Sequence, residues 1–179
     1  MRNKRLKAGS LRRRFASPTA TEALNAQFTR AHISARDFNE AREYLQVLRG
    51  RRLVSIQRAL LFSAIVAYAR PFTQNERTPT PSTTSQLGVK LNKELTKPEL
   101  ALHDKLVALR NQALAHSEYT QKAVRRVMGT PTGFVVQAKL FDVLSEPIDR
   151  KLFGELCHKM ALFCSRKMME LNHKLGTTK

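Results

Sequence analysis

The sequence predicts an all-α protein, a four- or five-helix up-and-down bundle in a single domain. Several segments place apolar residues three and four positions apart, which is the spacing of an amphipathic helix. Residue pairs typical of helix starts, and Gly or Pro at helix ends, separate these segments. A chain of 179 residues is long enough for one domain with a sizeable core and short for two. We expect that domain to span residues 20–176.

The first strongly periodic segment begins at Ser34 and Asp37, a pair that resembles a helix capping box. Apolar residues then recur three and four apart up to Gly50, at Phe38, Ala41, Leu45 and Leu48. This pattern predicts an amphipathic helix that Gly50 ends. Residues 20–32 are predicted to form a helix that leads into it.

Residues 53–69 are apolar all round, which predicts the central helix of the bundle, ended by Pro71. The most apolar run, residues 59–69, has eleven residues, whereas a membrane span needs about 20. We therefore predict a buried helix and no membrane partner. A Pro- and Thr-rich loop follows at residues 71–95, with a length typical of functional or disordered loops.

A third helix is predicted to begin at Thr96, with Pro98 in its first turn and Glu99 completing a capping box. Its apolar positions are Leu102, Leu106, Leu109 and Ala113. Residues 123–144 then fit a small β-hairpin insertion, because Val- and Phe-rich stretches flank a predicted turn at residues 128–133 (MGTPTG).

The last helix is predicted to open at Ser145 and Pro147 and to run to Gly176, with a Lys- and Arg-rich outer face. Cys157 and Cys164 lie on one face of it, about 10 Å apart, so they cannot pair with each other. We predict that both are core residues. Because no His pair at ligand spacing accompanies them, we expect no metal site and no cofactor.

The net charge of +18, with a pI near 10.8, favours a partner with dense negative charge, either nucleic acid or an anionic membrane face, and RNA or DNA is the leading prediction. Residues 1–19 hold seven Lys and Arg and no acid, among them Arg12, Arg13 and Arg14. We expect a disordered arm that binds phosphates, although an organelle transit peptide has the same composition. Arg70 is interpreted first as a cation at a helix C-terminus and second as a phosphate contact.

Residues 108–119 (ALRNQALAHSEY) place Arg110, Asn111 and His116 on a mostly apolar helix with small neighbours. This stretch resembles the signature of the HEPN superfamily (higher eukaryotes and prokaryotes nucleotide-binding domains): an Arg, a polar residue that is often Asn, and a His a few residues further on. The resemblance implies a bundle of HEPN type and a metal-independent endoribonuclease that works as a homodimer. It further implies a cytoplasmic protein of the toxin, phage-defence or RNA-processing kind, with an antitoxin or other protein as a further partner.

The chemistry of these residues suits RNA cleavage without metal. A base must take the proton of the 2′-hydroxyl and a cation must offset charge on the transition state, roles that His116 and Arg110 can fill. The two lie about 120° apart round an ideal helix and about 9 Å apart along it, which favours a site shared by two subunits or a distorted helix. Asn111 is assigned to orienting the His or holding a phosphate oxygen. The alternative is a non-catalytic helical module in which these residues form a dimer interface.

The other histidines are weaker candidates for a functional site. His103 precedes Arg110 by seven positions and is interpreted as a partly buried helix residue bonded to a carbonyl, rather than as the edge of the site. His32, His158 and His173 have no companion at useful spacing. The chain has no Gly-rich phosphate loop and no convincing carboxylate pair, so ATP hydrolysis and glycosidase chemistry have no support.

Overall fold

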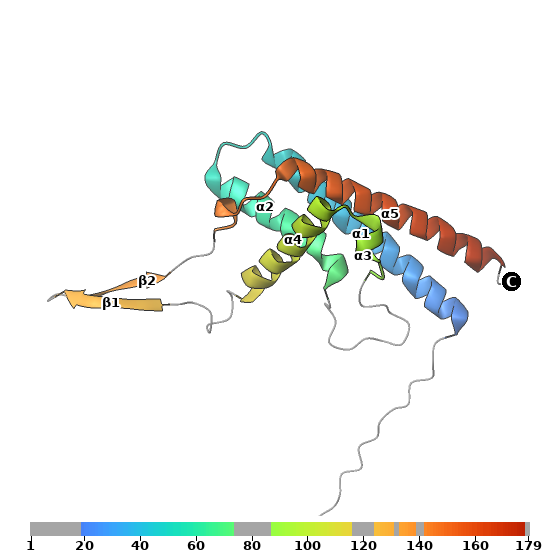
Figure 1. The fold of residues 1–179 in the computed structure, drawn as a ribbon, viewed down its shortest axis with the longest axis horizontal. Helices are drawn as coiled ribbons and strands as arrows, with labels where there is room; N and C mark the ends of the chain where they lie inside the picture. The colour runs from blue at the N-terminus through green and yellow to red at the C-terminus, as the bar shows by residue number, and fades with distance from the viewer. Residues whose placement is uncertain (1–18, 74–86, 116–123, 131–132, 139–141, 178–179) are drawn as a thin grey trace, which may run out of the picture.

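The computed structural model describes residues 19–73, 87–115, 124–130, 133–138 and 142–177 (Figure 1). Four long helices dominate this part of the chain: α1 (Ala20–Leu48), α2 (Val54–Ala69), α4 (Lys97–Ala115) and α5 (Arg150–Thr177). A one-turn helix, α3 (Leu91–Glu94), precedes α4, and two short strands lie between α4 and α5. The all-α bundle that the sequence predicts is confirmed.

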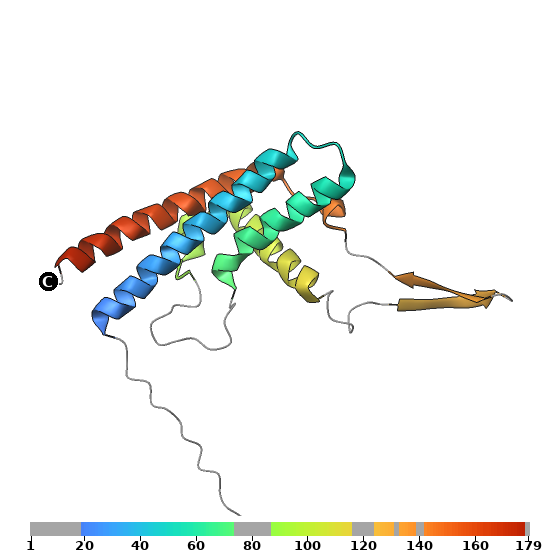
Figure 2. The same ribbon diagram turned by 180° about the vertical axis from the view of Figure 1, so that it is seen from behind.

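The helices α1 and α5 form a long antiparallel pair, and α2 runs back along α1 (Figure 1). α4 crosses α2 obliquely, and Figure 2 shows the same arrangement from behind. Side chains from all four long helices meet in one core, including Phe38, Leu61, Leu106, Phe153 and Met160, each almost fully buried. The packing of α1, α2 and α5 thus leaves α4 with one side against the core and one side toward solvent.

The predicted helix start at Ser34 is wrong, because α1 is one continuous helix that already begins at Ala20. Thr19 caps it, with Glu22 accepting a hydrogen bond from the Thr19 backbone N–H at 2.8 Å. Ser34 is fully buried within the helix, and Asp37 accepts a hydrogen bond from Arg70. Ser34 and Asp37 therefore match the sequence pattern of a capping box, but both lie in the middle of α1 and face inward.

The second helix agrees with its predicted bounds, and its C-terminal half is buried as expected. At the end of α2 the chain continues into a 3₁₀ turn, Arg70–Phe72, with Pro71 in its first turn. The N-terminal turns differ from the prediction of an all-round buried helix, because Leu53 is 64% exposed. Within the described residues, no helix combines the length and the apolar character that a membrane crossing requires.

An aromatic cluster fixes the C-terminal half of α2 to its neighbours. The rings of Phe38, Tyr68 and Phe72 pack against one another with centroids 5.5 to 5.7 Å apart. Phe153 of α5 meets Tyr68 edge-on at 5.5 Å, and His103 of α4 meets Phe72 edge-on at 4.5 Å. Large rings from four segments therefore hold α1, α2, α4 and α5 together at one level of the bundle.

The predicted start of α4 is confirmed. The carboxylate of Glu99 accepts hydrogen bonds from the Thr96 backbone N–H at 2.7 Å and from the Thr96 hydroxyl at 2.8 Å. Lys159 of α5 donates to the same carboxylate at 2.7 Å, which ties the first turn of α4 to α5. Burial alone raises the pKa of Glu99, but the bonds from Lys159 and Thr96 hold it below its usual value.

The predicted start of α5 is a few residues early. Ser145 belongs to a 3₁₀ turn (Val143–Ser145), and Asp149 caps the helix by accepting from the backbone N–H groups of Lys151 at 2.9 Å and Leu152 at 3.0 Å. The N-cap is thus Asp149, and Asp is among the residue types preferred at this position. Cys157 and Cys164 are both buried and free, as predicted.

The strands β1 (Val124–Thr130) and β2 (Gly133–Ala138) pair antiparallel, as the Val- and Phe-rich stretches predict. The turn is narrower than residues 128–133, because four of these six residues lie in the strands. The hairpin points away from the helices in both views (Figures 1 and 2). Arg58 of α2 anchors the chain that returns from it by pairing with Asp142 at 3.0 Å.

Candidate functional site

The last turns of α4 place the motif arginine at the edge of the core. Arg110 is half-buried, next to Leu106 and Leu109, which pack inward, while Asn111 is exposed. The Nη1 group of Arg110 donates to the Asn111 side-chain oxygen at 3.1 Å. Asn111 thus contacts the guanidinium directly, and its role in orienting the His or holding a phosphate oxygen stays a prediction.

His116 lies outside the described residues, immediately after α4 ends at Ala115. Arg12, Arg13 and Arg14 also lie outside them. The structure therefore gives the geometry of the motif for its Arg and Asn, which both stand on regular helix.

The solvent side of α4 forms a stripe of exposed residues that ends at the motif. Ala101, Asp104, Ala108 and Asn111 are exposed and recur three and four positions apart, which puts them on one face of the helix. We call this face the α4 stripe. Two of its four members are alanines, so another helix can approach the backbone closely beside Arg110.

Arg70 joins α2 to α1 at the far side of the aromatic cluster. Its Nη1 group donates to Asp37 at 3.2 Å and to Glu40 at 2.8 Å. Burial raises the pKa of Asp37, while a hydrogen bond from Tyr44 is the main cause that lowers the pKa of Glu40. Arg70 therefore has a structural role, as in the first of the two interpretations from the sequence. It acts by pairing with carboxylates of α1 and not through the helix dipole alone.

Arg30 completes the polar contacts at this end of α2. Its Nη2 group donates to the backbone carbonyls of Arg70 at 3.2 Å and Pro71 at 3.1 Å. These carbonyls belong to the 3₁₀ turn that follows α2. An arginine of α1 thus holds this turn against α1.

His103 is buried, 5% exposed, as the sequence predicts, but its partner is the Tyr68 hydroxyl at 2.9 Å rather than a carbonyl. Burial lowers the pKa of His103, so the ring is neutral at neutral pH. The hydrogen bond satisfies two polar groups within the aromatic cluster. We therefore assign His103 to the core.

The other Arg–His combination, Arg166 and His173 on α5, does not form a comparable site. Arg166 is mostly exposed and pairs with Glu94 of α3 at 3.1 Å. His173 is exposed. Their surroundings fit the solvated basic face that the sequence predicts for α5.

Three arginines in the turn between α1 and α2 were not singled out from the sequence. Arg49, Arg51 and Arg52 are all exposed. The signal that identifies them is the absence of Asp and Glu from residues 44–75, which leaves no local carboxylate to neutralise them. We call these three residues the basic turn.

Among the described residues, no group of three or more His, Cys, Asp or Glu side chains is placed to hold a metal ion. Comparisons of this chain with protein-family models, with curated proteins and with solved structures find no match. The functional assignment therefore depends on the residues of the α4 motif, on their neighbours and on charge.

Proposed function

We propose that this protein is a HEPN-like RNA-binding protein and a metal-independent endoribonuclease that acts as a homodimer in the cytoplasm. The observation that supports this proposal is the hydrogen-bonded Arg110–Asn111 pair in the last turns of α4, six and five residues before His116 in the sequence. In this proposal the enzyme works in toxin, phage-defence or RNA-processing systems.

Each motif residue has a stated part in the proposed reaction. His116 accepts the proton of the 2′-hydroxyl, whose oxygen attacks the adjacent phosphate as the bond to the 5′-oxygen of the next nucleotide breaks. The leaving 5′-oxygen takes a proton from water. Arg110 offsets the charge that builds up on the phosphate oxygens. Its hydrogen bond to Asn111 limits the orientations of the guanidinium before RNA binds. The products carry a 2′,3′-cyclic phosphate and a 5′-hydroxyl.

The α4 stripe supports the dimer in this proposal. A second α4 that packs on Ala101 and Ala108 brings two motifs into one cleft, because Asn111 lies on the same face. A shared cleft also resolves the spacing of Arg110 and His116, since the Arg of one subunit can act with the His of the other.

RNA cleavage by the purified protein in EDTA tests the proposal. The wild type should cut and leave 2′,3′-cyclic phosphate ends, and Arg110→Ala and His116→Ala should each lower the rate by about 100-fold or more, the usual scale for one acid–base group. The matched controls Arg166→Ala and His173→Ala remove the same residue types from α5 and should cut normally.

The exposed α4 stripe also fits the second candidate, a non-catalytic module that binds nucleic acid or protein. If neither wild type nor controls cut, and Arg110→Ala or Asn111→Ala shifts the dimer toward monomer in analytical ultracentrifugation, the motif is an interface. Cleavage that survives Arg110→Ala and His116→Ala would reject the nuclease assignment.

A further inference from the structure

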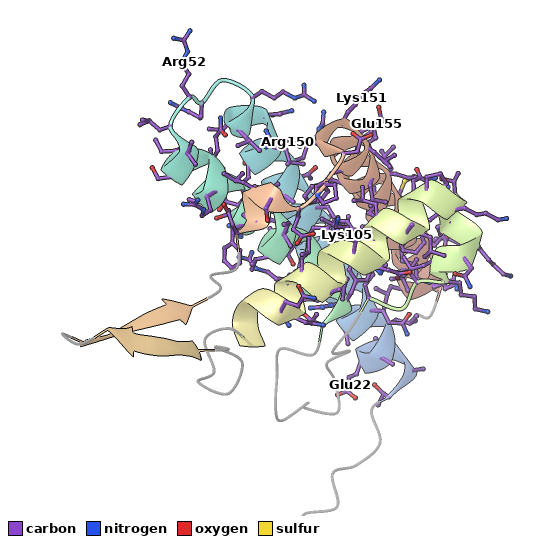
Figure 3. All side chains as sticks on the ribbon, turned by 60° about the vertical axis from the view of Figure 1, so that its left-hand side comes forward. Glu22, Arg52, Lys105, Arg150, Lys151 and Glu155 are labelled. Carbon is purple, nitrogen blue, oxygen red and sulfur yellow. The ribbon has the colours of Figure 1, made fainter. Side chains whose placement is uncertain are left out.

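The basic turn is a cluster of three exposed arginines in a stretch of the chain without Asp or Glu. Arg49 follows the last residue of α1, and Arg51 and Arg52 precede α2. Figure 3 shows Arg52 extending outward from this turn, with Arg150 and Lys151 at the adjacent start of α5. Arg150 and Lys151 are also exposed. We call these five residues the basic pole.

The cations of the basic pole differ from arginines elsewhere on the surface. Arg58, one turn into α2, pairs with Asp142, and Arg166 pairs with Glu94. Within the described residues, none of the five cations of the basic pole forms a salt bridge. Asp149 precedes Arg150 in the chain, and its carboxylate accepts hydrogen bonds from the backbone N–H groups of Lys151 and Leu152. Figure 3 also labels Glu155, one turn beyond Lys151 on α5. The pole therefore has unneutralised positive charge available for an anionic partner.

The turn is held in a defined shape. The Gln57 side chain donates to the backbone carbonyl of Arg51, and the backbone N–H of Arg51 donates to the Leu48 carbonyl at 3.2 Å. These bonds join the end of α1 to the start of α2. The arginine side chains thus extend from a fixed backbone, which lowers the entropy that binding must overcome.

Two of these charges are unfavourable in the free protein. Arg51 and Arg52 precede the N-terminus of α2, where the helix dipole repels cations, and the first turn of α2 has no acid to offset them. A bound anion would remove this repulsion. Charges placed against the local electrostatics are more often explained by binding than by stability.

The exposed apolar side chains indicate which form of RNA fits. The large apolar residues that are exposed in the described part of the chain are all aliphatic: Ile33, Val47, Leu53, Val54, Ile56, Leu162 and Met169. Proteins that bind single strands stack bases on aromatic side chains. Helical RNA is instead bound largely through its backbone, and arginines suffice for contacts to the phosphates.

We propose that the basic pole binds the phosphate backbone of double-helical RNA. This inference rests on the proposed RNA-binding function and adds the substrate class, a structured RNA held away from the cleavage motif. The forked guanidinium groups of the basic turn contact successive phosphates, and Arg150 and Lys151 extend the contact onto α5.

The test measures binding of a 20-base-pair RNA duplex and of one of its strands, both 2′-O-methylated to prevent cleavage, over a range of salt concentrations. The wild type should bind the duplex more tightly. In the variant Arg49→Gln/Arg51→Gln/Arg52→Gln, the slope of log affinity against log salt should fall by about 2 to 3, close to 0.9 for each phosphate that the variant no longer neutralises. The control Arg58→Gln/Lys105→Gln/Arg166→Gln removes three paired cations and should keep a slope near that of the wild type.

Each other outcome overturns a stated claim. If the wild type binds neither RNA, the proposed RNA-binding function itself fails. Three outcomes would reject this inference alone. The basic-turn variant could keep the wild-type slope, or it could weaken RNA binding no more than the control does. The wild type could also prefer the single strand. If a variant Leu53→Ser/Val54→Ser loses as much RNA affinity as the basic-turn variant, apolar contacts contribute as much as the phosphate contacts, and the inference also fails.

Discussion

The two ends of α2 use arginine in opposite ways. At the C-terminal end, Arg70 is bonded to Asp37 and Glu40 of α1, and Arg30 donates to backbone carbonyls of the 3₁₀ turn that follows. At the N-terminal end, the basic turn has no salt bridge within the described residues. One end therefore fastens the bundle, and the other offers its charge to a partner.

Burial follows the same division along α2. Tyr68, near the C-terminal end, is fully buried in the aromatic cluster, whereas Leu53 and Val54 at the N-terminal end are more than half exposed. The difference shows that a single apolar helix can be a core element over one half and a surface element over the other. Its function changes where the neighbouring helices stop covering it.

The largest expected effect comes from breaking the packed end. Phe38→Ala should lower the free energy of unfolding by about 3–5 kcal/mol, because Phe38 is fully buried against Tyr68 and Phe72. Urea denaturation followed by circular dichroism measures this loss. The control Leu53→Ala, at the exposed end, should change stability by less than about 0.5 kcal/mol.

Should Phe38→Ala fail to fold, Phe38→Leu keeps most of the volume and is expected to cost less than about 1.5 kcal/mol. If Phe38→Ala and Leu53→Ala lower the free energy of unfolding equally, both ends of α2 are packed alike, which contradicts the difference described above.

A smaller effect is expected from Arg70→Gln. The change leaves the buried Asp37 carboxylate without this cation, and because Arg70 is 41% exposed, screening by water limits the loss to about 1–2 kcal/mol. The same denaturation assay measures it. Arg58→Gln breaks an exposed pair and should leave stability unchanged; a loss as large as that of Arg70→Gln would show that burial of the carboxylate is not the cause.

The smallest effect concerns pH. Burial lowers the pKa of His103 in the folded state, so the unfolded state binds more protons below its own pKa of about 6.5. Stability is therefore full above that value and falls as the pH drops through it, by at most about 1.4 kcal/mol at about pH 5.5. Denaturation at about pH 7.5 and 5.5 should show this difference in the wild type and a smaller one in His103→Gln.

Tyr68→Phe separates burial from the hydrogen bond. It removes the partner of His103 but keeps the ring buried, so the pH dependence should persist while stability falls at both pH values. The basic turn contains only arginine as a charged residue and keeps its charge throughout this range, so RNA binding at the basic pole should not follow the same curve. A pH dependence that survives in His103→Gln would assign the effect to another group.

The sequence predicts helix positions well where residues close together in the chain determine them. The Thr96–Glu99 capping pair, the stop at Pro71 and the spacing of apolar residues in the last helix all correspond to the structure. The pattern at Ser34 and Asp37 does not mark a helix start, because both residues lie inside α1, where Ser34 is buried and Asp37 is paired with Arg70 of a distant segment.

The candidate site was predictable only as a pattern. Arg110 and Asn111 stand out from the sequence, but the hydrogen bond between them and the exposure of the α4 stripe emerge from the helix packing. The sequence does not single out the basic turn, because in a basic chain only the surroundings of an arginine show whether its charge is paired.

By itself, the sequence determined the positive charge of this protein and the positions of most helices, because composition and contacts within one or two helical turns are sufficient for both. The tertiary structure alone decided which cations are neutralised and which polar side chains are buried. Arg70 meets Asp37 across 33 residues, and Tyr68 meets His103 across 35. Such pairs depend on how helices pack, which no local pattern contains.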